Sequence, residues 1–180
     1  KHTLVYVTHD QEEAMSVADR MCIMDGGRVV QVGTPDEVYN FPETVYVAEF
    51  VGSPPINLID GRYEKGRFTA TDPALTVGVP DAKNQPDCDA VIGFRPEDIQ
   101  VDREVGPGAI SANVYELEPL GAYAIVDVQA GERVIRAQIP GQPQFELGEP
   151  VHVTPNLDRC HFFESAGGRR FGTGAVAAGG

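Results

Sequence analysis

The sequence predicts a mainly β protein, in which a short α/β segment precedes a small β-barrel domain. Twenty glycines and fourteen prolines among 180 residues imply many turns and therefore many short strands. From Gly52 onward, short stretches of β-type residues alternate with Gly, Pro or Asp, a pattern typical of a small barrel. Before Gly52, apolar runs typical of strands lie on either side of a stretch whose apolar residues recur at helical spacing. This order of elements indicates an α/β segment.

The α/β segment opens with an apolar run over residues 4–7, of the kind that a buried parallel strand shows. Such a strand needs neighbours on both sides, so we expect the chain to begin inside a larger domain. Apolar surface left uncovered over residues 1–33 is expected to be buried by self-association or strand exchange.

The order of elements in this segment follows from capping and turn residues. Asp10 is expected to cap a helix, with Glu13 at capping-box spacing. Thr34 and Pro35 predict the start of a second helix. The remaining predicted elements are strands over residues 21–24 and 28–32, a turn over 25–27 and a short helix over 45–50.

The stiff turn Gly52-Ser53-Pro54-Pro55 predicts a domain boundary. Beyond it we expect strands over residues 57–63, 68–70, 75–79, 90–94, 111–117, 122–128, 133–139 and 151–154. The resulting domains are residues 1–52, residues 53–171 and a tail, 172–180, whose small and Gly-rich composition predicts disorder.

Charge and cysteine content exclude several classes of function. A net charge of −13 disfavours nucleic-acid binding, which depends on neutralising phosphates with Lys and Arg. Cys22, Cys88 and Cys160 are too far apart for a zinc motif and odd in number for a disulfide framework. We therefore expect reduced cysteines in the cytosol, no metal site and no nucleic-acid partner.

The segment THDQEEAM carries the first candidate site residue, His9. A histidine at the end of a buried strand, before a capped helix, lies at the edge of the sheet where α/β proteins bind ligands. Its imidazole can hydrogen-bond a phosphate oxygen. Taken alone, however, a histidine in this position is more often held by backbone groups.

Together with Ala18-Asp19-Arg20 and MCIMDGGRVVQVGTPDEVY, this segment resembles the switch-histidine region of ABC-transporter ATPases. The resemblance implies that His9 contacts the γ-phosphate of ATP between two subunits. The phosphate-binding motif GxxxxGK[ST], the LSGGQ signature and the upstream general base do not occur in this sequence. We therefore expect ATP and Mg in the intact subunit only, and no ATPase activity from this chain alone.

Two later motifs point to the carbohydrate branch of this family, which includes the maltose and glycerol-3-phosphate importers. FVGSPPINLIDG resembles the junction to the regulatory domain, with Ile56-Asn57 where the family has Met-Asn. GFRPEDI is similar to the Arg-Pro-Glu motif of the transport-associated OB-like (TOBE) domain, which implies that Arg95, Pro96 and Glu97 lie in or near regulatory dimer contacts. From the residues alone, this motif is equally a strand-ending turn held by a local ion pair.

The fold class that the resemblance implies is an OB-like β-barrel regulatory domain after an incomplete remnant of the ABC ATPase domain. The intact subunit is expected to hydrolyse ATP for the import of sugars or glycerol phosphate, on the inner face of the membrane. Its implied partners are a second copy, the transmembrane permease subunits and, as in some relatives, a cytosolic regulator. Two alternatives stay open: an OB-type module that binds a small oxyanion, and a purely structural dimerisation domain.

Overall fold

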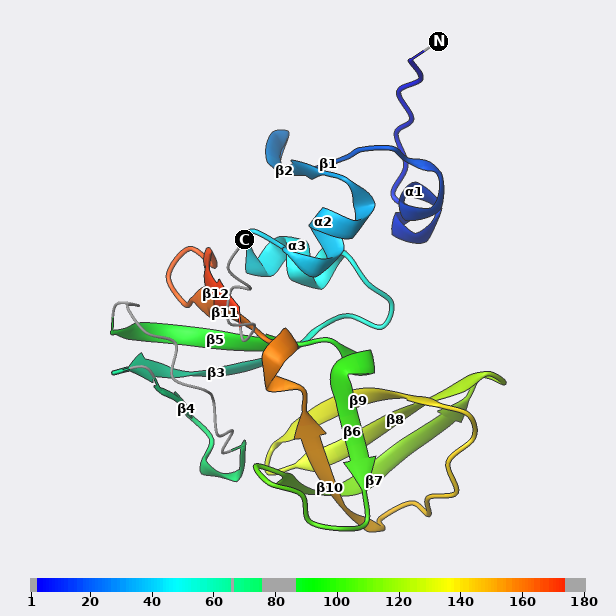
Figure 1. Ribbon diagram of the computed structural model, residues 1–180, viewed down its shortest axis with the longest axis vertical. Helices are drawn as coiled ribbons and strands as arrows, with labels where there is room; N and C mark the ends of the chain where they lie inside the picture. The colour runs from blue at the N-terminus through cyan, green and yellow to red at the C-terminus, as the bar shows by residue number, and fades with distance from the viewer. Residues whose placement is uncertain (1–2, 66, 76–86, 174–180) are drawn as a thin grey trace. The chain divides into compact units, whose positions relative to one another are not determined.

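The computed structural model describes residues 3–65, 67–75 and 87–173, and the chain divides into two compact units (Figure 1). The units are Lys1–Pro55 and Ile56–Gly180, whereas the sequence places a boundary after residue 52. Each unit buries its own cluster of apolar side chains. Along the described ranges, every helix is too short or too polar to span a bilayer.

The first unit contains three short helices and one hairpin. Its elements are α1 (Gln11–Val17), β1 (Met21–Asp25), β2 (Arg28–Gly33), α2 (Pro35–Asn40) and α3 (Val45–Phe50). They match the helices and strands that the sequence predicts after residue 9. Gly26 and Gly27 join the two strands with φ values of 53° and 78°, which L side chains rarely adopt. The hairpin therefore depends on glycine at both positions.

The helices of this unit begin where their capping residues predict. Thr34 and Glu37 form a complete capping box on α2, and the Thr44 hydroxyl caps α3. A small core of Met21, Ile23, Val38, Val47 and Val51 then packs α2, α3 and the hairpin together.

The expected strand over residues 4–7 is wrong for this structure. These residues form no described strand, and the side chains of Leu4, Val5 and Val7 are 83–90% exposed. The physical reason is that a strand of this type is stabilised by hydrogen bonds to neighbouring strands. No described strand lies beside these residues: β1 and β2 pair only with each other.

The second unit consists of two five-stranded antiparallel sheets. One has the order β6-β10-β7-β8-β9, and the other has the order β12-β11-β5-β3-β4. Their strands are β3 (Asn57–Glu64), β4 (Arg67–Ala70), β5 (Cys88–Phe94), β6 (Ile99–Asp102), β7 (Ile110–Pro119), β8 (Tyr123–Ala130), β9 (Arg133–Pro140), β10 (Pro150–Pro155), β11 (His161–Glu164) and β12 (Arg170–Thr173). Short 3₁₀ turns are η1 (Pro73–Leu75), η2 (Pro96–Asp98) and η3 (Leu157–Arg159).

The first of these sheets curls into a nearly closed barrel, because its two outer strands, β6 and β9, also lie against each other. Within this sheet, β10 is hydrogen-bonded to β6 on one side and to β7 on the other. Apolar residues of both sheets share one core, which includes Tyr63, Phe94, Val126 and Phe162. This architecture confirms the predicted OB-like β domain.

Seven of the predicted strands in this unit are present within a few residues of their expected ends. The expected strand over 75–79 lies mostly outside the described residues, and Leu75 itself ends η1. Strands β6, β11 and β12, each four residues long, are not among the strands predicted above. Gly172 and Thr173, which the sequence assigns to a disordered tail, lie in β12, and the rest of that tail is outside the described residues.

The side chains of Asn57 and Arg133 join the two sheets by hydrogen bonds to backbone groups. The Asn57 side chain, at the start of β3, accepts a hydrogen bond from the Arg136 backbone N–H at 2.8 Å and donates one to the Arg136 carbonyl at 2.8 Å. It also donates to the carbonyl of Phe94 at 3.3 Å. Arg133 reinforces the contact, since its guanidinium donates to the Leu58 carbonyl at 3.0 Å. Asn57 thus gives β9 the bonds that a neighbouring strand would supply.

We predict that Asn57→Ala lowers the free energy of unfolding of the chain by about 2–3 kcal/mol, because it leaves the Arg136 backbone groups without partners. Asn113→Ala is the matched control, since Asn113 is an exposed asparagine on β7, and it should change stability by less than about 0.5 kcal/mol. Urea unfolding followed by circular dichroism measures both. Equal effects of the two substitutions would contradict the role given to Asn57.

Candidate functional site

His9 lies in a bend immediately before α1, and its side chain is exposed. The residues on either side of it are held by local hydrogen bonds. The Asp10 backbone N–H donates to the Thr8 hydroxyl at 3.0 Å, and the Asp10 carboxylate accepts from the Glu13 N–H at 3.0 Å. Asp10 is therefore the N-cap of α1, as predicted, and His9 is presented at the point where the chain enters the helix.

The capping box expected at Asp10 and Glu13 forms only in half. The Glu13 carboxylate does not return to the Asp10 backbone but accepts from the Tyr6 hydroxyl at 3.1 Å and the Thr8 hydroxyl at 3.2 Å. The hydrogen bond to Glu13 and the charge of its carboxylate raise the pKa of Tyr6. Glu13 thus ties α1 to Tyr6 and Thr8, in the segment that precedes His9.

A second set of hydrogen bonds joins Gln11, at the start of α1, to Gly52. The Gln11 side chain donates to the Gly52 carbonyl at 3.3 Å and accepts from the Gly52 N–H at 2.6 Å. This contact could not be predicted from the sequence, because no motif joins residues so distant in the chain. The only sequence signal was the polar side chain of Gln11, since Gly52 contributes backbone groups alone.

The Arg95-Pro96-Glu97 motif lies in the second unit, where β5 ends and η2 begins. Arg95 is 2% exposed and Pro96 is buried, whereas Glu97 is exposed. Of the three residues predicted to lie at a dimer contact, only Glu97 presents its side chain to solvent.

Asp98 anchors this turn to the far end of β10. Its carbonyl accepts from the Asn156 N–H at 2.7 Å, and its carboxylate pairs with the Arg159 guanidinium at 3.1 Å. Burial raises the pKa of Asp98, and the nearby charge of Arg159 acts in the opposite direction. Asp98, one of the two acids that the sequence offered for an ion pair, is therefore paired, but its partner is Arg159, far along the chain, and not an arginine of the motif itself.

His161, on β11 beside this turn, is a buried imidazole. It is 5% exposed, and within the described ranges its Nδ1 has no hydrogen-bond partner. Burial lowers its pKa to about 4, helped by the positive charges of Arg95, Arg170 and Arg159. The ring is therefore neutral at pH 7. Among the described residues, no group of three or more His, Cys, Asp or Glu side chains that could hold a metal ion is found.

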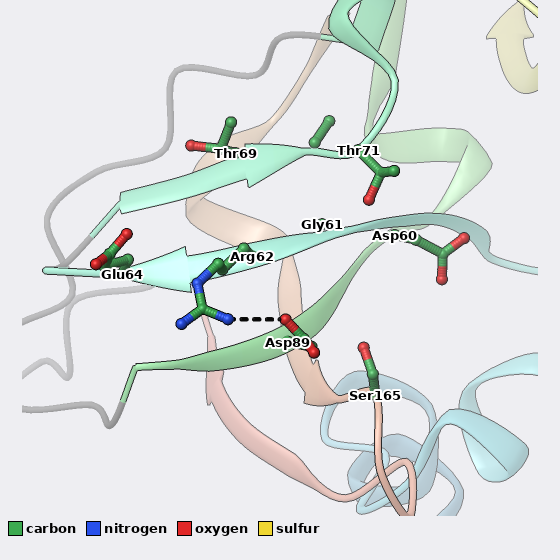
Figure 2. Close-up of a pocket in the computed structure, with 9 residues that line it drawn as sticks. Asp60, Gly61, Arg62, Glu64, Thr69, Thr71, Asp89 and Ser165 are labelled. Atoms are coloured by element: carbon green, nitrogen blue, oxygen red, sulfur yellow. Dashed lines mark hydrogen bonds and ion pairs between the residues drawn. The ribbon is translucent and has the colours of Figure 1, made fainter.

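A separate polar cavity of about 560 Å³ opens beside β3, β4 and β5 (Figure 2). Figure 2 shows Arg62 turned toward Asp89, to which it is paired at 3.0 Å, with Ser165 close to the carboxylate. The other polar side chains in its lining come from Asp60, Glu64, Thr69 and Thr71. Among the described residues that line it there is no histidine, cysteine or lysine, and none of the site residues predicted from the sequence. An exposed ion pair of this kind adds little stability.

The pH dependence of stability should report the buried His161. The unfolded chain binds a proton on this residue near pH 6.5, whereas the folded chain does so only near pH 4. Because the unfolded state binds more protons between these values, the free energy of unfolding should fall by up to about 3 kcal/mol as pH drops from 7 to 4. Asp98 shifts stability in the opposite sense, since its raised pKa favours the protonated folded state.

Urea unfolding of the wild-type chain and of His161→Gln across this pH range separates the two contributions. In the variant, the free energy of unfolding should no longer change with pH through His161, and it should keep the pH dependence that carboxylates such as Asp98 supply. An identical slope in both proteins would show that His161 keeps its ordinary pKa in the folded state.

Comparison with known protein families adds to this geometry. The MalK OB fold domain family matches residues 52–99, and the TOBE domain family matches residues 92–163. Together these matches cover the curled sheet and most of the second sheet.

Curated relatives extend the match to nearly the whole chain. The sn-glycerol-3-phosphate import ATP-binding protein UgpC 3 of Rhizobium etli is 38% identical over 94% of this chain and 47% of its own length. The multiple sugar-binding transport ATP-binding protein MsmK of Streptococcus mutans is 37% identical over 91% of this chain and 48% of its own length. The oligosaccharides import ATP-binding protein MsmX of Bacillus subtilis is 34% identical over 91% and 47%.

The chain spans about half the length of these relatives. The match includes both the helix-and-hairpin unit that carries His9 and the β unit that carries the Arg95-Pro96-Glu97 motif. The two family models and the import ATP-binding relatives together show that the chain is related to the C-terminal part of ABC-importer ATP-binding subunits, with a MalK OB fold domain and a TOBE domain.

Proposed function

We propose that this chain is the C-terminal regulatory and dimerisation part of the ATP-hydrolysing subunit of an importer for sugars or glycerol phosphate. The observation that carries the proposal is the exposed His9 at the start of a capped helix, in the same chain as an OB-like barrel. The printed names of its relatives, which are import ATP-binding proteins for glycerol phosphate and for sugars, support the class of cargo.

In the intact subunit, His9 is the switch histidine that contacts the γ-phosphate of ATP. An imidazole suits this role because one ring nitrogen donates a hydrogen bond and the other accepts one. Asp10 cannot take over the contact, since its carboxylate is used in capping α1. ATP and Mg are held mainly by other parts of the subunit, and this chain contributes the group that senses the terminal phosphate.

The subunit works as a homodimer on the cytoplasmic face of the membrane, attached to two transmembrane permease subunits. Its β unit holds the two copies together and receives signals from a cytosolic regulator. The acidic charge of the chain supports protein partners over nucleic acid.

The role of His9 is tested in the full-length subunit by measuring kcat and KM for ATP. His9→Ala should lower kcat by about 100-fold or more while KM for ATP changes little, because the lost contact acts on the reacting phosphate. His152→Ala, a histidine on β10 in the β unit, is the control and should leave kcat unchanged. Activity that survives His9→Ala would overturn the proposed function.

The dimer contact is proposed to use the turn that follows β5. Arg95 and Pro96 are buried, so they shape the turn, and the exposed Glu97 makes the contact with the second copy. Asp98 supports this arrangement by fixing the turn to Asn156 and Arg159.

We expect Glu97→Lys to weaken self-association of the chain about tenfold, since a reversed charge at a close contact opposes binding. Glu104→Lys makes the same change of charge at another exposed glutamate and serves as the control. Sedimentation velocity over a range of concentrations measures both dissociation constants. If both variants associate like the wild type, Glu97 is not at the dimer contact.

A further inference from the structure

The Gln11 side chain connects the start of α1 to a backbone position 41 residues later. Its amide bonds both polar groups of a single peptide residue: Nε2 donates to the Gly52 carbonyl, and Oε1 accepts from the Gly52 N–H. Two bonds to one residue fix the direction as well as the distance between the partners. Gln11 is half-buried, so water competes with these bonds less than it does at the surface.

On one side of this link, Gly52 is held at the end of α3. Val51 is fully buried in the small core and donates its N–H to the Val47 carbonyl at 2.9 Å. Gly52 follows with a φ of 121°, which glycine adopts at little cost and other residues rarely adopt. The next residues lead to Pro55, where the first unit ends. Gly52 is therefore the last part of the first unit that is firmly packed before the chain enters the β unit.

On the other side, Gln11 is separated from His9 by Asp10 alone. Asp10 is bonded to Thr8 through its backbone and to Glu13 through its side chain, and Thr8 in turn contacts Glu13. Because this loop is closed by short bonds, it moves with the first turn of α1. A displacement of Gly52 that pulls on Gln11 therefore reaches the backbone of His9.

We propose that Gln11 is a positioning residue that couples the junction leading to the β unit with the switch histidine. A signal received by the β unit then alters ATP hydrolysis by moving His9, without a change at the phosphate-binding groups themselves. The inference rests on the proposed function of His9. It adds the route by which the regulatory part acts on the reaction.

Gln31 provides a matched control in the same unit. It is a buried glutamine that also makes two amide bonds to backbone: it donates to the Phe41 carbonyl at 3.1 Å and accepts from the Glu43 N–H at 2.8 Å. These bonds join β2 to the link between α2 and α3, away from His9 and Gly52 in the chain. A substitution there removes the same chemistry without touching the proposed route.

The test is a double-mutant cycle in the full-length subunit, with kcat and KM for ATP as readouts. Gln11→Ala should lower kcat about fivefold or more and leave KM within about twofold, whereas Gln31→Ala should leave both within about twofold. Gly52→Ala, which strains the junction, should lower kcat in the wild-type background and have little further effect in Gln11→Ala. Thermal melts check that Gln11→Ala and Gln31→Ala lose similar stability.

Hydrogen exchange on the chain described here supplies a readout that needs no ATPase activity and no Gly52 variant. Gln11→Ala should speed exchange at the amides of residues 10–13 and of Gly52, and Gln31→Ala should not. If the two glutamine variants change kcat and exchange equally, the inference fails while the role of His9 stands. If His9→Ala retains full activity, the proposed function fails, and the exchange data still report whether Gln11 links α1 to Gly52.

Discussion

The β unit depends on the contact between Asn57 and the backbone of Arg136. Two separate five-stranded sheets share one core, and apolar contacts alone do not fix the position of one sheet relative to the other. Apolar packing is non-directional, whereas the three hydrogen bonds of the Asn57 amide have fixed lengths and directions. The bonds of Asn57, together with the bond from Arg133 to the Leu58 carbonyl, therefore define the register between β3 and β9, and the surrounding apolar residues fill the remaining space.

The side chain of Arg136 also holds β9 in place, through an ion pair with the adjacent strand of the curled sheet. Its guanidinium forms two bonds with the Asp127 carboxylate on the adjacent strand, at 2.7 and 2.6 Å. Asp127 is 5% exposed, so this pairing satisfies a charge that would otherwise be costly to bury. The backbone of Arg136 is thus held by Asn57 and its side chain by Asp127, which fixes β9 where the sheet closes against β6.

The sequence predicted elements that are determined locally and missed those that depend on distant partners. The start of α2 could be predicted from Thr34, Pro35 and Glu37, because helix capping involves residues only three positions apart. The run over residues 4–7 was predicted as a strand from its composition, but strand formation requires partners that local composition does not reveal. Motif resemblance located His9 and the Arg95-Pro96-Glu97 turn. It did not reveal that Arg95 is buried and Glu97 exposed, since burial is decided by the packing of residues far apart in sequence.

Gln11, Gln31 and Asn57 solve one physical problem in three places. Each lies on a strand or helix next to a segment with which that element forms no sheet. Each side-chain amide donates one hydrogen bond to the backbone of this neighbouring segment and accepts another from it. A carboxylate could accept the N–H but could not donate to the carbonyl, and a hydroxyl is too short to reach both groups at once. An amide also has no charge to lose or gain with pH, so the links persist when neighbouring carboxylates titrate. Each unit thereby obtains backbone pairing that its sheets do not provide, and in the first unit this pairing links the backbone of Gly52 to Gln11, two positions after His9.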